Sequence, residues 1–342
     1  GLNASWTLYN GNKRLKTIQQ EKLNNQVAEL DVATSENNIQ ESIAQVYIQI
    51  LYAAESVKVN ESTLQVSIAQ RDRGQELLNA GSIAKSDFAQ LEAQVSTDRY
   101  QLVTAQATLE DYKLQLKQLL ELDGENEMNI YLPVLSDENV LLPLPAKKDV
   151  YMSALTLRPE IEASKINVEA SELGIDIAKA GYLPTISLSA GIGTNHTSGS
   201  DFTFGEQVKN GWNNSIGVSV SVPIFNNRQT KSAVQKAKLQ RETSLLSLLD
   251  EQKTLYKTIE GLWLDANSAQ QRYAAANEKL KSTQISYDLI SEQFDLGMKN
   301  TVELLTEKNN LLQAQQEQLQ AKYMAILNTQ LLKFYQGDKL AL

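Results

Sequence analysis

The sequence of 342 residues contains no cysteine, a single histidine and only six prolines, and aromatic residues make up 6% of it. Without cysteine the chain can form neither a disulfide framework nor a thiolate metal site. It has no run of about 18 apolar residues, which excludes a transmembrane helix. Its net charge of −9 argues against nucleic acid and anionic lipid head groups as partners.

Residues that support catalysis or metal binding are scattered. His196 lies in a loop rich in serine and glycine, where a lone histidine is more often exposed to solvent than a ligand. The four methionines lie far apart and form no thioether site of the kind that binds copper. No nucleophile, base and oxyanion donors come together. We therefore predict that the chain is not an enzyme and holds no cofactor or metal.

Two stretches, 185–194 and 214–223, alternate between apolar and small polar residues. A period of two places the apolar side chains of a strand on one face. A tilted strand of about 9–11 residues with an apolar outer face can span a bilayer. The alternative that the pattern leaves open is a half-buried hairpin of a soluble β-sandwich. The residues expected to face lipid are Ile186, Leu188, Ile192, Ile216, Val218, Val220 and Val222.

Residues 1–9 repeat the alternation and predict a third membrane strand. Two proline-free stretches, from 10 to about 80 and from about 226 to 296, carry apolar or small residues at alternate spacings of three and four, as in a coiled coil. About 70 residues at ~1.5 Å each would make a helix roughly 100 Å long. Each stretch ends near a glycine, Gly81 or Gly297, and a returning helix follows. We predict two helical hairpins, at 10–122 and 225–335.

The segments between the hairpins are shorter and more varied. Residues 123–157 contain three prolines, which break helices, so we predict a compact side module with a short strand at 128–132. Proline in a first helical turn predicts a helix over 158–183. Residues 184–224 are expected to hold two strands and an external polar loop at 195–211, and residues 336–342 form a tail.

The two hairpins are related by an internal repeat with an offset of 216 residues. Gly81 and Gly297 differ by this offset, and so do several other positions along the two stretches. A joint match of strand end, helix length and glycine tip is hard to obtain by chance, so we predict a duplicated unit of strand, long helix, tip and returning helix. Other matched pairs are Asn10 and Asn226, Ile43 and Ile259, Tyr47 and Trp263, and Asp87 and Glu303.

With these motifs the sequence resembles the TolC-type family of bacterial outer-membrane efflux proteins, the outer membrane factors. The resemblance is carried by RPEI at 158–161, YLP at 182–184, PIF at 223–225 and FDLG at 294–297. It implies a mainly α fold in which long antiparallel coiled-coil hairpins form an α-barrel and a few transmembrane strands join a shared trimeric β-barrel. Residues 123–157 and the tail would form an equatorial module. The first repeat opens at the family's second strand, so we expect three strands here where the family has four.

The resemblance also assigns roles to residues at the tips. It implies a pore constriction at Glu303, and an acidic second position where this chain has Thr306, with Glu307 as a partial substitute. It implies contacts with an adaptor at Gly81 and Gly297. A tip gate between hairpins would involve Ser86, Asp87, Phe294 and Lys299. Phenylalanine lacks a hydroxyl and lysine lacks the guanidinium fork, so we expect a loose gate.

The function implied by the resemblance is a passive exit duct of a tripartite efflux or type I secretion system. The duct would lie in the bacterial outer membrane and extend into the periplasm. Its partners would be outer-membrane lipid, two further copies in a homotrimer, a periplasmic adaptor (membrane fusion) protein and an inner-membrane transporter, with no nucleic acid. The alternative is a trimeric coiled-coil stalk or adhesin that does not conduct.

Overall fold

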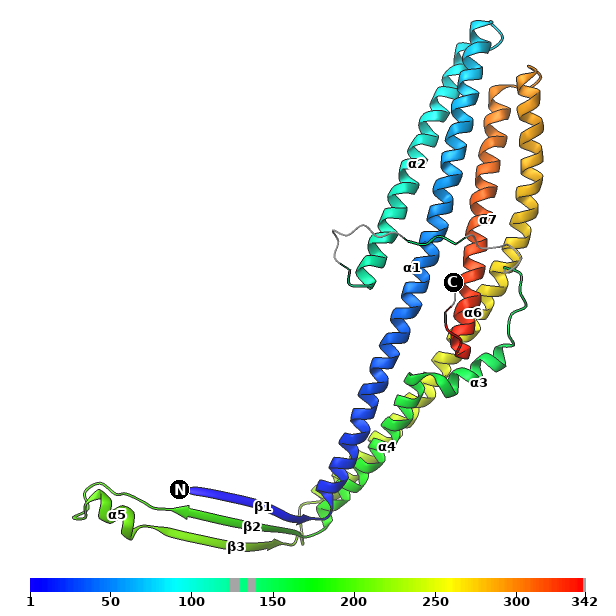
Figure 1. Cartoon of the computed structure of the whole chain (residues 1–342). Coiled ribbons are helices and arrows are strands. Elements are labelled where there is room, and N and C mark those ends of the chain that lie inside the picture. The colour runs from blue at the N-terminus through cyan, green and yellow to red at the C-terminus, as the bar shows by residue number, and fades with distance from the viewer. Residues whose placement is uncertain (123–129, 134–139, 341–342) are drawn as a thin grey trace. The chain divides into compact units, whose positions relative to one another are not determined.

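The computed structural model describes residues 1–122, 130–133 and 140–340 (Figure 1). The chain divides into two compact units, residues 1–34 with 158–253 and residues 35–157 with 254–342, and each is described by itself. The elements in chain order are β1 (Leu2–Asn10), α1 (Lys13–Asn79), α2 (Lys85–Leu119), α3 (Lys147–Leu157), α4 (Pro159–Lys179), the 3₁₀ turn η2 (Ala180–Tyr182), β2 (Thr185–Gly193), α5 (Phe204–Asn210), β3 (Asn213–Ser221), α6 (Gln229–Asp295) and α7 (Thr301–Gln336).

The first unit contains an antiparallel sheet in the order β1-β2-β3, as Figure 1 shows. All three stretches predicted to be strands form strands, although β3 ends at Ser221 and leaves Val222 just outside it. The register between β1 and β2 shifts between Thr7 and Tyr9, so Leu8 forms a bulge and Tyr9 pairs with Ile186. Residues directly opposite each other share a face of the sheet, so the bulge brings Tyr9 onto the apolar face.

Three helical segments accompany the sheet in this unit. The side-chain amide of Gln20 on α1 donates to the carbonyl of Ala170 on α4 over 2.8 Å. On α6, the guanidinium of Arg241 donates to the carboxylate of Glu172 on α4 over 2.9 Å. The helix α4 therefore binds the sheet-proximal parts of both long helices.

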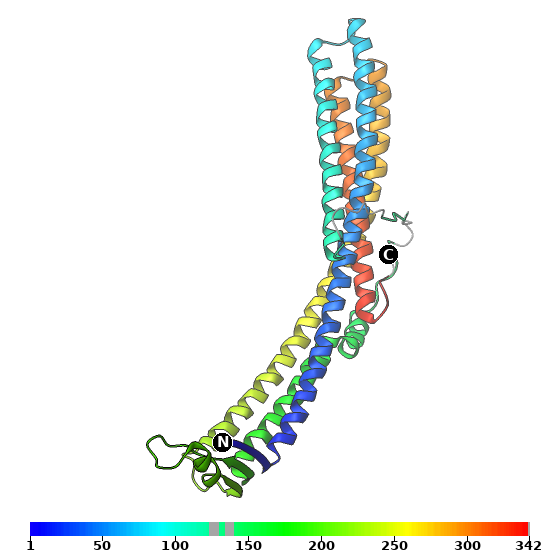
Figure 2. The same ribbon diagram turned by 60° about the vertical axis from the view of Figure 1, so that its left-hand side comes forward.

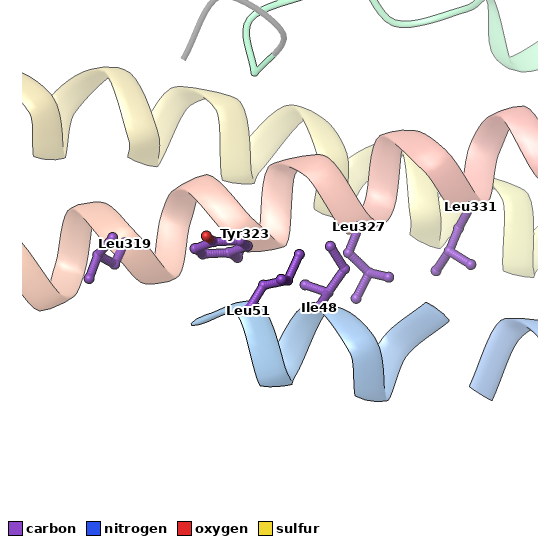
Figure 3. Packing of buried hydrophobic residues seen from close by; sticks show 6 residues of the cluster. All are labelled: Ile48, Leu51, Leu319, Tyr323, Leu327 and Leu331. Carbon is purple, nitrogen blue, oxygen red and sulfur yellow. The ribbon is translucent and has the colours of Figure 1, made fainter. Parts of the chain in front are cut away.

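The second unit contains the two hairpins. Figures 1 and 2 show α2 returning antiparallel beside α1 and α7 returning beside α6. The hairpins meet in an apolar cluster between α1 and α7, where side chains of both helices point toward each other (Figure 3). The α7 residues of the cluster are spaced by four, so that neighbouring members lie on the same side of the helix. The buried members are Ile48, Leu51, Leu319, Tyr323, Leu327 and Leu331.

Residues 130–133 and 140–157 attach to the hairpins through a few hydrogen bonds. The hydroxyl of Tyr47 donates to the carbonyl of Tyr131 over 2.7 Å, and the indole N–H of Trp263 donates to the carbonyl of Pro145 over 3.1 Å. The amide of Gln270 donates to the carbonyls of Val140 and Leu142 at 3.0 and 2.8 Å. The sequence analysis missed α3. Residues 130–132 form no strand, and the rest of the predicted strand, 128–129, lies outside the described residues.

The backbone repeats with the predicted offset of 216 residues. Helix α6 begins and ends 216 positions after α1, and α7 begins 216 positions after α2. Among the described residues with positive φ, all but Gly199 occur in pairs with the same offset, which confirms the duplication at the level of single residues. The pairs are Gly11 and Asn227, Asn12 and Arg228, Gly81 and Gly297, and Glu121 and Gly337.

Candidate functional site

The apolar face of the sheet is the first candidate surface. Directly opposite pairs on it are Ile186 with Val220 and Leu188 with Val218, and Leu188 also pairs with Trp6 on β1. Ile216 is 81% exposed, and Val218, Val220 and Ile192 are exposed as well, while Ile186 and Leu188 are half-buried. A continuous exposed apolar face of this kind marks a lipid or protein contact surface.

The opposite face of the sheet is polar. Ser187 pairs with Ser219, and Ser189 pairs with Gly217. In the described residues the outer edges of β1 and β3 pair with no further strand. Unpaired edges expose backbone N–H and C=O groups that can bind another strand. The sheet therefore has one apolar face, one polar face and two edges that are unpaired among the described residues.

Aromatic side chains lie near the strand ends. Tyr182, Trp212 and Phe225 are 54%, 57% and 83% exposed. No described helix is both long enough and apolar enough to cross a membrane.

The loop between β2 and β3 contains the helix α5, which the sequence analysis missed. The backbone N–H of Thr203 donates to the carboxylate of Glu206 over 2.9 Å, and these contacts hold the pKa of Glu206 below its usual value. His196 packs its ring edge-on against Phe204, with ring centroids 5.2 Å apart. Among the described residues no group of three or more His, Asp or Glu side chains is arranged to hold a metal ion.

The two hairpin tips form the second candidate surface. Gly81 and Gly297 have φ angles of +71° and +72°, and a Cβ added to either would have no atom within 4 Å. Their backbone N–H groups donate to the carbonyls of Leu78 and Phe294. Glycine is therefore favoured at both tips by the left-handed backbone that ends each long helix, not by crowding.

The second tip carries a charged capping arrangement. Asn300 caps α7 by accepting from the backbone N–H of Glu303 over 2.9 Å, and the Glu303 carboxylate accepts in return from the backbone N–H of Asn300 over 3.2 Å. Lys299 donates to the same carboxylate over 2.6 Å. The Lys299 contact, followed by the Asn300 contact, lowers the pKa of Glu303 from its usual value. Glu303 is thus an anionic group held in place at the tip.

The other predicted constriction residues follow Glu303 on α7. The hydroxyl of Thr306 donates to the carbonyl of Val302 over 2.7 Å, and Thr306 is exposed. Glu307 accepts from the hydroxyl of Ser286 on α6 over 3.2 Å. Within one chain, Glu307 therefore connects the two helices of its own hairpin, and the constriction itself stays a prediction.

The predicted tip-gate residues lie at both tips. Asp87 accepts from the backbone N–H of Ala84 over 3.3 Å, and Ser86 is exposed beside it. Phe294 is only 3% exposed and belongs to the interior of the second unit. Lys299 pairs within its own helical turn, with Glu303. The gate between hairpins stays a prediction.

Comparison with known proteins places this architecture in a family. A sequence model described as outer membrane efflux protein matches residues 150–337, which is more than half of the chain. The chain is 25% identical over 294 residues to the outer membrane efflux protein BepC of Brucella suis, covering 85% of this chain and 61% of BepC. It is 23% identical over 313 residues to the outer membrane protein TolC of Escherichia coli, covering 88% of this chain and 62% of TolC.

The fold agrees with a solved structure. The crystal structure of CusC, from work on conformational changes accompanying folding and transmembrane channel formation, superposes with a TM-score of 0.83 at 19% identity. The match covers 98% of this chain and 77% of that chain. The chain belongs to the outer membrane efflux protein family, which confirms the resemblance and the fold class. It spans about three fifths of the length of BepC and TolC.

Proposed function

We propose that this chain forms part of the wall of an outer-membrane channel that serves as a passive exit duct. The single observation that carries the proposal is the exposed sheet with an apolar face on one side and a polar face on the other. A membrane strand needs lipid against the apolar face, and closure of the sheet to satisfy its edges. Membership of the outer membrane efflux protein family supports the same function.

The proposed assembly is a homotrimer. One sheet of three strands cannot close on itself, so its edges require strands from other copies or from further parts of the protein. The long helices would extend the duct into the periplasm. A periplasmic adaptor would contact the tips at Gly81 and Gly297, and an inner-membrane transporter would supply the energy.

The constriction is proposed at Glu303, with Thr306 and Glu307 beside it. A ring of fixed carboxylates around an axis favours cations and repels anions. The lowered pKa of Glu303 supports this role, because it favours the ionised form of the carboxylate. The exposed hydroxyl of Thr306 would add a neutral polar group to the lining.

The proposal is tested by recording currents across a planar lipid bilayer that contains the full-length protein. We expect stepwise, cation-selective currents, and we expect Glu303→Gln to shift the reversal potential in a salt gradient toward zero. A protein that inserts but gives no current would favour the non-conducting stalk or adhesin. Unchanged selectivity in Glu303→Gln would remove Glu303 from the constriction.

A matched pair of variants tests the membrane strands separately. Val218 lies on the apolar face and its neighbour Ser219 on the polar face, and both are exposed. Arginine facing lipid near the middle of the bilayer costs about 2–4 kcal/mol. We expect Val218→Arg to reduce insertion into vesicles strongly and Ser219→Arg to leave it nearly unchanged. Equal effects of the two variants would contradict the assignment of the lipid face.

A further inference from the structure

A buried polar cluster joins the two hairpins in the second unit. Asp98 on α2, Lys308 on α7 and Ser67 on α1 are 1%, 3% and 2% exposed. The Lys308 ammonium donates to the carboxylate of Asp98 and to the hydroxyl of Ser67, and that hydroxyl donates to the same carboxylate oxygen. Gln94 donates to the other carboxylate oxygen over 2.9 Å. The hydrogen-bonding capacity of the carboxylate and the hydroxyl is thus well used.

The cluster interrupts the apolar seam of α2, in which Leu91 and Val95 precede Asp98 and Leu102 follows it. Asp98 falls within the heptad seam of α2, where an apolar residue would normally pack. Burial lowers the pKa of Lys308 from its usual value, and the pairing with Asp98 opposes that effect. A buried charge that loses its partner is strongly unfavourable, so such a cluster is either fully formed or open to water.

The cluster also marks a boundary in the contacts between hairpins. Away from the tips, Ser56 on α1 donates to Gln316 on α7 over 3.1 Å. One helical turn toward the tips, Gln70 donates to Tyr287 on α6 over 2.9 Å. Within the described residues 71–93 and 288–307, every side-chain hydrogen bond and ion pair stays inside one hairpin. Polar contacts between the hairpins therefore end close to the cluster.

We propose that Ser67, Asp98 and Lys308 form a latch that fixes α7 against the first hairpin and confines separation of the hairpin tips to the residues beyond it. The internal repeat does not reproduce the latch at the equivalent positions. The positions 216 residues away from its members are Thr283, Ala314 and Glu92, which cannot reproduce it. The device is therefore asymmetric and would make one hairpin interface firmer than its counterpart.

The latch is tested by spin-label distance measurements on the full-length protein, diluted with unlabelled protein so that distances within one chain dominate. These 342 residues contain no cysteine, so labels can be placed at chosen sites within them. One pair, at Ser82 and Met298, reports on the tips. The other, at Val103 and Gln313, reports on α2 and α7 on the side of the latch away from the tips, and both positions are exposed.

We expect a narrow distance distribution at Val103 and Gln313 in the wild type, with a broader one at the tips. Asp98→Asn and Lys308→Met should each at least double the width at Val103 and Gln313. The control Glu92→Gln removes an exposed carboxylate from the same helix and should leave the width unchanged. Variants that retain their helical circular dichroism and show an unchanged width would overturn the proposal. The readout is a helix-to-helix distance, so it does not depend on whether the protein conducts.

Hydrogen exchange on the wild-type protein decides the question if the variants fail to fold. We expect the protection factors of the backbone amides to be at least tenfold lower on the tip side of the latch than on its other side. This step should occur at Ser67 in α1, at Asp98 in α2 and at Lys308 in α7. In α6 no such step should occur at Thr283, the repeat position of Ser67. The same gradual decline in all four helices would overturn the latch.

Discussion

The two repeats share a backbone but differ in what their side chains do. Their long helices begin and end 216 residues apart, and four pairs of positive-φ residues match at that offset. At mid-length, Tyr47 and Trp263 occupy equivalent positions and both bind carbonyls of the segment between the repeats. The tips differ, because Asn300 caps α7 whereas the equivalent Ala84 has no side chain that can accept.

This comparison indicates how a duplicated unit becomes specialised. The positions that set the backbone keep residues able to adopt the same conformation, whereas interface positions have diverged. The second tip pairs Lys299 with Glu303, whereas the first tip has Ile83 and Asp87 at these positions, and the positions equivalent to the latch residues are Thr283, Ala314 and Glu92. The variants below are chosen in repeat-related or otherwise matched pairs, so that each measures one difference.

The largest expected loss of stability comes from breaking the latch. Lys308→Met leaves Asp98 buried without its ionic partner, and breaking a buried pair in this way costs about 3–5 kcal/mol. The repeat-related variant Glu92→Gln alters an exposed residue and should change stability by less than about 0.5 kcal/mol. Urea unfolding followed by circular dichroism measures both. Similar losses of unfolding free energy in the two variants would mean that the two repeat-related positions do not differ in their contribution to stability.

Gly11 gives the next largest effect. Its φ is +67°, and an added Cβ would lie 2.8 Å from the Cβ of Leu183. Gly11→Ala should therefore cost about 2–4 kcal/mol, from backbone strain and overpacking together. At Gly81, where nothing lies within 4 Å, only the backbone strain of about 1–2 kcal/mol applies. Thermal unfolding of both variants checks the order, and a larger loss for Gly81→Ala would contradict it.

The equivalent aromatic residues Tyr47 and Trp263 test the mid-length attachment. Tyr47→Phe removes one hydrogen bond, worth about 1 kcal/mol. Trp263→Phe removes a hydrogen bond and weakens the contact with the Lys147 ammonium 4.4 Å from the ring centroid, which adds about 0.5–1 kcal/mol. Hydrogen exchange of residues 140–157, which contain Pro145, should therefore increase more in Trp263→Phe than exchange of residues 130–133, which contain Tyr131, increases in Tyr47→Phe. The reverse order would show that the two anchors are not equivalent.

How much of this could be predicted from the sequence depended on the length of each pattern. The long helices, both tips and the strands followed from periods repeated over many residues and from the 216-residue offset. The short helix α5 was missed, although Thr203 and Glu206 have the spacing of a capping box. The helix α3 gave no comparable signal.

Features that depend on a partner could not be predicted. The bulge at Leu8 is set by the register of β1 against β2, so the pattern of β1 alone does not reveal it. The pairing of Asp98 with Lys308 joins residues 210 positions apart in different repeats. The interruption of an apolar seam by Asp98 was visible in the sequence, but nothing in one helix identified its partner.

The smallest effect concerns Glu303. Its folded-state pKa is lowered, so its contribution to stability is present above the ordinary value of 4.5 and is lost as the pH falls through the lowered pKa. We expect protection of residues 301–306 to decrease on acidification below that value, and Glu303→Gln to remove this pH dependence. Hydrogen exchange corrected for the intrinsic effect of pH provides the measurement. The same dependence of protection on pH in the wild type and in Glu303→Gln would show that the Glu303 carboxylate is not its cause.

The most direct test of the whole account is a cryo-electron microscopy structure of the full-length protein in lipid nanodiscs. The account predicts three copies around a hollow axis, with Ile216, Val218 and Val220 against lipid and Glu303 near the axis. A structure in which those three apolar residues are buried in a protein interior, with no open axis in the assembly, would contradict it.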